Sequence, residues 1–106
     1  MYASVRKFRC RPDQVADALH RVDELFAPRL EEMPGFVAYE CVDCGDGIVC
    51  SMTVCADSES SQRSVMMSAE FLRDDLADIE IERLEALDGQ VSVSRARDQV
   101  LQPAHA

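Results

Sequence analysis

The dipeptide Asp46-Gly47 lies between two runs of residues with high β-propensity, and this arrangement limits the possible folds more than any other feature. The runs cover residues 36–43 and 48–55 and are rich in β-branched residues, aromatic residues and cysteine. An Asp-Gly pair suits a two-residue type I′ turn, in which both central residues take positive φ angles. The sequence therefore predicts an antiparallel β-hairpin with these two runs as its strands.

Two stretches show the apolar periodicity of amphipathic helices. Residues 12–33 carry apolar residues at steps of three and four, and Pro28 is expected to kink or interrupt this helix within the preceding turn. A second helix is predicted to start after an N-cap at Asp57 or Ser58 and to end near residue 79. Each helix is predicted to bury one apolar stripe against the hairpin.

The remaining strands define the fold class. Residues 2–10 are expected to form a first strand, and residues 90–95, which alternate with period two, a last strand after a charged connection. The order βαββαβ favours an α+β, ferredoxin-like fold: a four-stranded antiparallel sheet with the first and third strands central and both helices on one face. We expect one domain over residues 1–95 and a polar C-terminal tail over residues 96–106.

Side chains alternate between the two faces of a hairpin, so the sequence also predicts which residues the helices cover. The set assigned to the helix-covered core is Val37, Tyr39, Cys41, Ile48, Cys50, Met52 and Val54. The opposite face has no helix to cover it and still carries several apolar residues, so we expect it to form a homodimer interface. The residues predicted for this interface are Phe36, Ala38, Val42, Val49, Ser51, Thr53 and Cys55.

Charge and hydropathy limit the partners. The chain of 106 residues has 20 acidic and 11 basic residues and a formal net charge of -9, which repels nucleic acid and anionic lipid surfaces. We therefore expect neither nucleic acid nor a membrane as a partner. The N-terminus is charged where a signal peptide would be apolar, and no apolar stretch approaches the ~20 residues of a membrane span. A cytoplasmic location is expected.

Five cysteines raise the question of a metal site. Cys41 and Cys44 have the spacing of a zinc knuckle, but Cys50 and Cys55 lie about 16 Å apart along an extended strand and on opposite faces. One metal ion cannot bind all four, so no metal is expected. A thioredoxin-like redox pair is disfavoured because acidic neighbours raise the pKa of a thiol. A disulfide between Cys41 and Cys50 remains open.

Few other side chains point to chemistry. His20 is most simply a solvated helix residue, and Met67 and Phe71 widen an apolar helix face that forms either core or a small-molecule pocket. Glu40 lies in a water-filled cavity, pairs with Arg6 or Lys7, or stands at an exposed edge. No glycine-rich phosphate loop, nucleophile elbow or metal-binding helix motif is present.

The segment "FAPRLEEMPGFVAYECVDCGDGIVCSMTVCADSE", followed by "AEFLRDDLADI", resembles the antibiotic biosynthesis monooxygenase (ABM)-like superfamily of dimeric α+β barrel proteins. The resemblance covers residues 2 to about 95. It rests on the helix-PGF-strand junction, the Gly-Asp-Gly hairpin and the aromatic residue at Phe71. It implies a ferredoxin-like fold whose exposed sheet face packs on a second subunit, with a cavity between sheet and helices in each protomer.

The resemblance leaves two functions open. Relatives include cofactor-independent oxygenases that act on aromatic polyketides and a haem-degrading branch whose site uses Asn and Trp, and this chain contains neither residue. We therefore expect no haem and no other cofactor. The first hypothesis is a non-catalytic dimer that binds a small apolar or aromatic ligand. The second is a cofactor-independent monooxygenase acting on a hydroxylated aromatic or polyketide-like substrate. No catalytic residue is assigned, and the candidate cavity-lining residues are Arg6, Phe8, Glu40, Met67 and Phe71.

Overall fold

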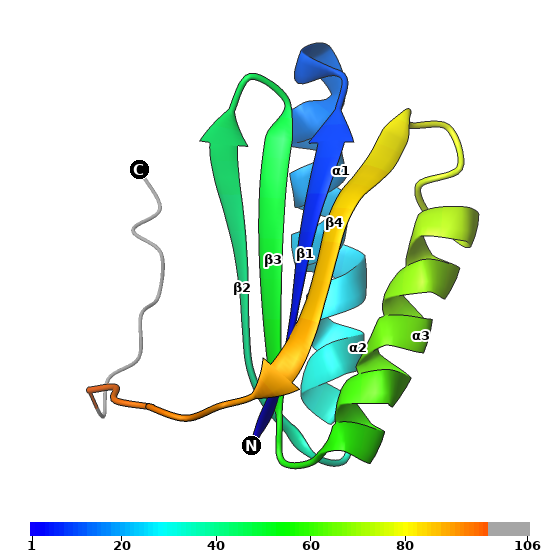
Figure 1. Ribbon diagram of the computed structural model, residues 1–106. Helices are drawn as coiled ribbons and strands as arrows, with labels where there is room; N and C mark the ends of the chain where they lie inside the picture. Colours follow the sequence, from blue (N-terminus) through cyan, green and yellow to red (C-terminus); the bar gives the residue numbers. More distant parts are fainter. Residues whose placement is uncertain (98–106) are drawn as a thin grey trace.

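The computed structural model describes residues 1–97 and shows a single sheet with helices on one side (Figure 1). Its strands are β1 (Tyr2–Cys10), β2 (Phe36–Gly45), β3 (Ile48–Cys55) and β4 (Ile81–Gln90). All pairs are antiparallel and the order is β2-β3-β1-β4, so the first and third strands are central. The predicted ferredoxin-like βαββαβ fold is confirmed.

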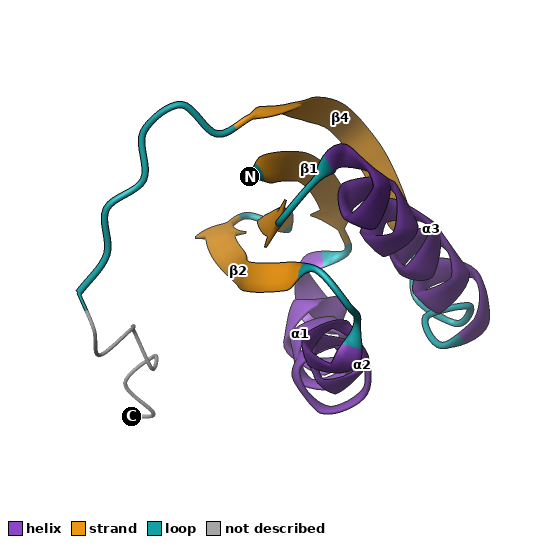
Figure 2. Ribbon diagram, turned by 90° about the horizontal axis from the view of Figure 1, so that it is seen from below, coloured by secondary structure: helices purple, strands orange, loops and turns teal. Residues whose placement is uncertain are grey.

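The helices form the second layer (Figure 2). They are a 3-10 turn (Pro12–Gln14), α1 (Val15–Arg21), a π-helical segment (Val22–Phe26), α2 (Ala27–Glu32) and α3 (Ser58–Asp74). The π-helical segment ends two residues before Pro28, which has no N–H to donate and whose ring crowds the carbonyl four residues earlier. The predicted interruption of the first helix is confirmed.

The start of α3 agrees with the prediction, and its end does not. Asp57 is the N-cap, and its carboxylate accepts a hydrogen bond of 2.8 Å from the backbone N–H of Ser60. That bond lowers the pKa of Asp57. The helix stops at Asp74 rather than near residue 79. Leu76 and Ile79 continue the apolar pattern as buried residues of the following turn.

The hairpin turn has the predicted type. Asp46 and Gly47 have φ angles of 54° and 81°, the positive pair of a type I′ turn. The backbone N–H of Cys10 donates a hydrogen bond of 2.7 Å to the carbonyl of Gly47, which ties the turn to the end of β1. A Cβ at position 47 would collide with the carbonyl oxygen of Cys10, so the turn also requires glycine for space.

The predicted last strand over residues 90–95 is wrong. The strand β4 begins nine residues earlier, and residues 91–97 have no regular secondary structure. The pairing of β1 with β4 shifts register between Lys7 and Phe8, which places an extra residue, Leu84, in β4 as a β-bulge. This bulge breaks the alternation that would mark a strand, and charged residues on an exposed edge conceal the rest. Most of the predicted tail, residues 98–106, lies outside the described residues.

The predicted faces of β3 are also wrong. A register shift between Asp43 and Gly45 inserts Cys44 as an extra residue in β2, which reverses the faces of β3 relative to β2. The residues of β3 that face the helices are therefore Val49, Ser51, Thr53 and Cys55, and those that face away are Ile48, Cys50, Met52 and Val54. Phe36 also packs against the core, so of the seven residues predicted for the interface only Ala38 and Val42 lie on the uncovered face.

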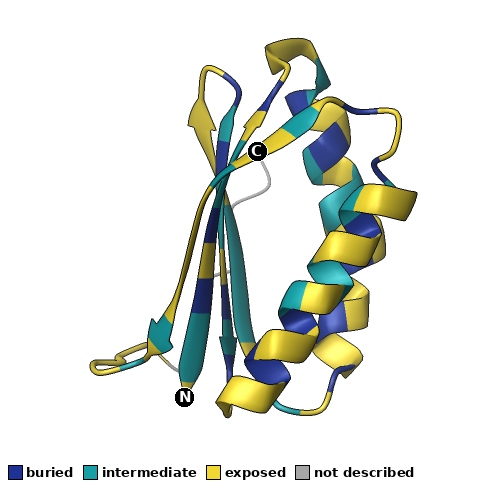
Figure 3. Ribbon diagram, turned by 45° about the vertical axis from the view of Figure 1, so that its right-hand side comes forward, coloured by how far each residue is buried: buried dark blue, intermediate teal, exposed yellow. Residues whose placement is uncertain are grey.

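The core lies between the inner face, which is the face of the sheet covered by the helices, and the helix layer (Figure 3). Phe26 is at its centre, with ring centroids 5.7 Å from Tyr39 and 5.1 Å from Phe71. Leu30 and Cys55 are fully buried. The π-helical segment positions Phe26 where α1 and α2 meet the sheet.

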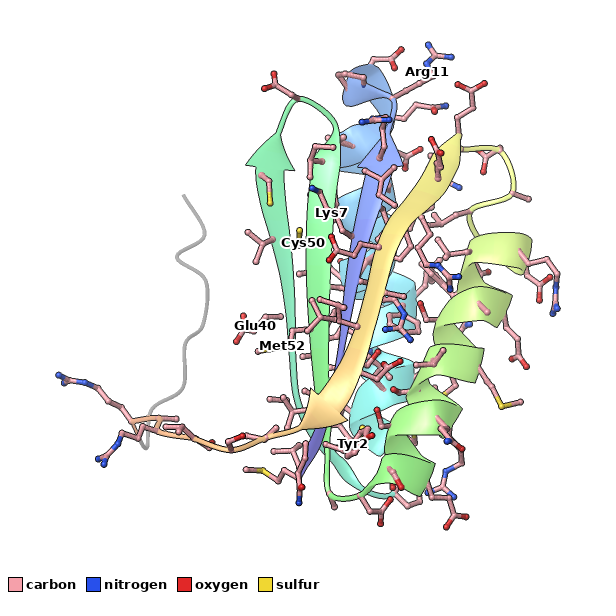
Figure 4. All side chains as sticks on the ribbon, viewed as in Figure 1. Tyr2, Lys7, Arg11, Glu40, Cys50 and Met52 are labelled. Atoms are coloured by element: carbon pink, nitrogen blue, oxygen red, sulfur yellow. The ribbon has the colours of Figure 1, made fainter. Side chains whose placement is uncertain are left out.

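The open face, on the other side of the sheet, has apolar and charged rows. Register pairing aligns Glu40, Met52, Val5 and Leu87 across the four strands, and Ala38, Val54, Ala3 and Gly89 form the next row. Val5, Met52 and Leu87 are 37%, 41% and 57% exposed. Towards the hairpin turn the rows become charged and include Lys7 and Glu85 (Figure 4). The open face is therefore an exposed apolar patch with a charged border.

Within residues 1–97, no helix has the length and apolar character needed to cross a membrane.

Candidate ligand-binding site

An inner cavity lies between the inner face and the helices and has two adjoining compartments, of about 60 and 70 Å³. The apolar compartment is lined mainly by core residues, including Cys10, Leu19, Val22, Phe71, Leu76 and Ile81. The polar compartment is lined by residues that include Ser4, Arg6, Thr53, Ser64 and Arg83. Both compartments share Phe8, Phe26, Tyr39, Ser51, Ser68 and Leu72.

The volume limits the size of a ligand. Pockets for drug-sized ligands hold about 300–1,000 Å³, whereas an apolar cavity of about 150 Å³ suffices for benzene in a well-studied lysozyme variant. The two compartments together approach the second value. The inner cavity therefore has room for a single ring or a short chain, with one end among apolar side chains and the other among polar ones.

The apolar compartment offers packing and three hydroxyl-bearing side chains, those of Tyr39, Ser51 and Ser68. Burial raises the pKa of Tyr39, so its phenol stays protonated and acts as a hydrogen-bond donor rather than as a base. Burial likewise raises the pKa of the Cys41 thiol, which keeps it from becoming a nucleophilic thiolate. His20 is exposed on α1, and no acidic side chain lines the inner cavity. Among the described residues, the cavity thus has no general base.

The polar compartment is organised around Arg6. This side chain is 10% exposed, and its Nη1 donates hydrogen bonds of 2.9 Å to the carboxylate of Asp88 and of 3.0 and 3.3 Å to the carbonyls of Val5 and Leu87. Nη2 lies 3.4 Å from the second oxygen of Asp88. The hydrogen bond from Arg6 lowers the pKa of Asp88. Asp88 therefore fixes the outer edge of the guanidinium.

The structure brings three of the five predicted cavity residues together. Arg6 and Phe8 line the polar compartment, and Phe71 lines the apolar one across from Phe8. Met67 contacts the core but otherwise lines a separate surface depression beside Met33 and Pro34. Their roles in binding stay predictions.

Glu40 does not lie in the cavity. It pairs with Met52 on the open face, where both are labelled in Figure 4, and is half-buried there. Of the alternatives considered for this carboxylate, a position toward the exposed edge of the sheet agrees with the structure, because β2 is an edge strand.

Sequence reasoning missed Arg83, Ser51, Ser68 and Phe26 as cavity residues. Arg83 pairs with Phe8 and therefore shares its face, as a result of the bulge at Leu84. Without that bulge Leu84 would pair with Phe8, and Arg83 would point away from the cavity. Phe26 is one of the regularly spaced apolar residues of the helix predicted over residues 12–33. That spacing predicts burial and does not distinguish a core residue from a cavity residue.

All five cysteines are free. Cys41 pairs with Ser51 on the inner face, whereas Cys50 pairs with Val42 on the open face, so the bridge between Cys41 and Cys50 is absent from this structure. Residues 1–97 contain no cluster of three or more His, Cys, Asp or Glu side chains that could hold a metal ion.

A larger depression of about 470 Å³ is open to solvent at the hairpin end of the sheet. Its two arginines already have partners: Arg11 lies 2.7 Å from Asp13, and Arg9 lies 4.0 Å from Glu82. The inner cavity, which is less open to solvent than this depression and is lined by aromatic rings, is the stronger candidate site.

Comparison with known proteins supports the fold through structure alone. No protein-family model matches the sequence, and no curated protein matches it. A dimeric ferredoxin-like protein from an uncultured marine organism superposes with a TM-score of 0.72 at 14% identity, covering 91% of this chain and 98% of that one.

Two further similar structures are described as monooxygenases. A proposed antibiotic biosynthesis monooxygenase from Chloroflexus aurantiacus has a TM-score of 0.69 at 16% identity, with 90% of this chain and 96% of that chain covered. The monooxygenase ActVA-Orf6 from Streptomyces coelicolor, solved with nanaomycin D, has a TM-score of 0.63 at 15% identity, with 90% and 92% covered. At these identities the likeness shows the fold alone, which is the ferredoxin-like α+β fold described above.

Proposed function

We propose that this protein is a homodimer that binds a small, largely apolar molecule in the inner cavity of each protomer. The observation that carries the proposal is the cavity itself: a partly open space beside Phe8, Phe26 and Phe71, in a fold whose two layers could otherwise pack without one. The ActVA-Orf6 monooxygenase, solved with nanaomycin D, has the same fold, which supports ligand binding as a use of this architecture.

The homodimer is supported by the open face. Val5, Val42, Met52 and Leu87 are all exposed on a sheet that has no second layer of helices on this side. A solvated antiparallel face is normally polar, so an exposed apolar patch of this kind, which spans two rows and also includes Glu40, favours a protein partner. A second copy docks its own open face by two-fold symmetry, which completes the dimeric α+β barrel. A ferredoxin-like neighbour of similar shape is itself dimeric.

A cofactor-independent monooxygenase is the second candidate. It is favoured by the phenol of Tyr39 in an apolar cavity, and by the monooxygenase that shares the fold. In such a reaction the substrate itself is the reductant of O2. The substrate loses two hydrogen atoms and gains one oxygen atom of O2, and the other oxygen atom leaves as water. The cavity offers hydrogen-bond donors but no base among its described residues, so binding without turnover accounts for the site with fewer requirements.

The binding proposal is tested with p-cresol, an uncharged phenol with a single ring. In two-dimensional ¹H–¹⁵N NMR titrations, amide shifts are expected to move around Phe26, Ser51 and Phe71. The Ser68→Leu variant places a larger side chain where the two compartments meet and is expected to abolish these shifts. Gln62→Leu, on the exposed side of the same helix, is the matched control and is expected to bind like the wild type.

Absence of binding in wild type, or equal binding by Ser68→Leu, would rule out the inner cavity as the site. Oxygen uptake in the presence of p-cresol and larger hydroxylated aromatics separates the two candidates. Uptake that Ser68→Leu abolishes and Gln62→Leu retains would favour the monooxygenase.

A further inference from the structure

Two arginines line the polar compartment, and Asp88, whose carboxylate pairs with Arg6, is not among the residues that line it. Arg6 and Arg83 line it together with serine and threonine hydroxyls, and no Asp or Glu side chain is among its lining residues. This is unexpected in a chain with a formal net charge of -9. Because Arg6 is already paired with Asp88, the unpaired positive charge of this compartment is that of Arg83.

The two guanidiniums project from neighbouring positions on the inner face. Arg83 pairs with Phe8, and Arg6 precedes Phe8 by two residues on the same strand, which places the two backbones on the order of 8 Å apart. The bulge at Leu84 is what turns Arg83 to this face. A β-bulge commonly changes the face to which one side chain points. Here it places Arg83, instead of Leu84, at the wall of the cavity.

Neither arginine has all its donors engaged. Asp88 and two carbonyls engage Nη1 and Nη2 of Arg6, whereas its Nε donates to no protein atom within residues 1–97 and is not fully buried. Arg83 is exposed at the cavity mouth and has no carboxylate within 4.0 Å and no side-chain hydrogen bond in the described part of the chain. Other arginines, such as Arg21 and Arg29, do have acidic partners.

We propose that the ligand of the inner cavity is a small amphipathic acid, with its carboxylate between Arg6 and Arg83 and its ring or short chain beside Phe8, Phe26 and Phe71. This inference rests on the proposed function and adds the chemical class of the ligand. Arginine matches a carboxylate with paired, charge-assisted hydrogen bonds, and the hydroxyls of Ser51, Thr53 and Ser68 line the path between the two compartments.

The test compares phenylacetate with phenylacetamide, which has the same shape and no charge at neutral pH. NMR titration is expected to show phenylacetate binding about tenfold more tightly, because charge-assisted hydrogen bonds are stronger than neutral ones. Arg83→Gln is expected to remove most of this preference and leave the affinity for phenylacetamide unchanged. Arg83→Lys, which keeps the charge, is expected to retain part of it.

Arg73→Gln is the charge-matched control, because Arg73 lies on α3, pairs with Asp74 and lines neither compartment. It should leave both affinities as in wild type. Acetate, which has no apolar body, is expected to bind much more weakly than phenylacetate.

The outcomes separate this inference from the proposed function. Equal affinities for phenylacetate and phenylacetamide, or an Arg83→Gln variant that keeps the preference, would overturn the amphipathic acid. Acetate binding as tightly as phenylacetate would also overturn it, because the apolar compartment would then contribute nothing. If p-cresol binds and phenylacetate does not, only this inference fails. If none of the aromatic probes binds, the proposed function fails with it.

Discussion

In a two-layer domain the sheet face covered by helices is usually apolar and the face toward water is usually polar. Here the inner face carries polar residues and the open face carries apolar ones. The inner face, enclosed by helices, carries Ser4, Arg6, Ser51 and Thr53 beside its apolar residues. The open face carries Val5, Val42, Met52 and Leu87 in positions that water reaches in the single chain. An isolated protomer gains stability from neither arrangement. The proposed function accounts for both faces, with a ligand beside the polar residues of the inner face and a second subunit over the open face.

The largest effect is expected from a charge on the open face. Val5 lies between Met52 and Leu87, at the centre of the apolar row, so Val5→Glu buries an unpaired carboxylate in the proposed dimer. The cost is several kcal/mol, enough to separate the subunits at micromolar concentration. Analytical ultracentrifugation should show wild type at twice the mass of the 11.8 kDa chain and the variant at that mass.

Met66→Glu is the control for this variant, because Met66 is 63% exposed on α3, away from the sheet. It should sediment like wild type. A wild type that sediments as a single chain, or a Val5→Glu variant that remains dimeric, would contradict the interface.

A smaller effect is expected from the inner face, where Asp88 holds Arg6. Asp88→Asn removes the carboxylate and should lower the free energy of unfolding by about 1 kcal/mol at pH 7, because half of the Asp88 side chain is exposed and solvent screens the pair. For a chain of this size that corresponds to roughly 4–8 °C in melting temperature. Thermal denaturation followed by circular dichroism measures the difference.

The pH dependence of that difference has a defined sign. Arg6 lowers the pKa of Asp88 in the folded protein below the value of about 3.9 that is typical of an unfolded chain. The stabilisation is therefore present above that value and is lost as pH falls through the folded pKa. Wild type and Asp88→Asn should converge in melting temperature on acidification. A gap that stays constant down to pH 2 would show that the charge of Asp88 is not its cause.

The smallest effect is expected from Thr53→Val, which replaces a hydroxyl in the polar compartment with a methyl group of similar size. Thr53 is buried, and its hydroxyl makes no side-chain hydrogen bond within residues 1–97. We expect a gain of roughly 0.5–1 kcal/mol in the free energy of unfolding, with weaker binding of phenylacetate. Urea denaturation and NMR titration measure the two quantities.

A loss of stability in Thr53→Val would instead give the hydroxyl a structural role. Val54→Thr, the reverse exchange on the open face, serves as the companion variant, and it should weaken the dimer without changing affinity for the ligand.

The parts of this structure that the sequence predicts are those with strong local causes. Asp46-Gly47 determines its turn through backbone angles, and Pro28 interrupts its helix through a missing donor. The faces of β3 and the position of β4 were wrong because each depends on a β-bulge. The bulges at Cys44 and Leu84 have no residue that requires them, and each reverses the alternation on which the face assignment rests.

The candidate site was predictable only in part for the same reason. Arg6 and Phe8 lie on a strand whose alternation is regular, and their common face could be inferred. Arg83 reaches the cavity through a bulge, and Glu40, which was predicted for the cavity, lies on the open face beside Met52. Such contacts depend on the register between strands that are distant in the sequence, and the local sequence pattern of one strand does not predict that register.

The π-helical segment Val22–Phe26 has one further consequence. A π-helical turn holds an extra residue, so the helix that follows it is rotated by about 100° relative to a continuous α-helix. Phe26 is the last residue of this segment, and its ring contacts both Tyr39 and Phe71. Removing any one residue from this turn would therefore alter the cavity as much as replacing the phenylalanine. In this part of the chain, the number of residues is as much a determinant of ligand choice as their identity.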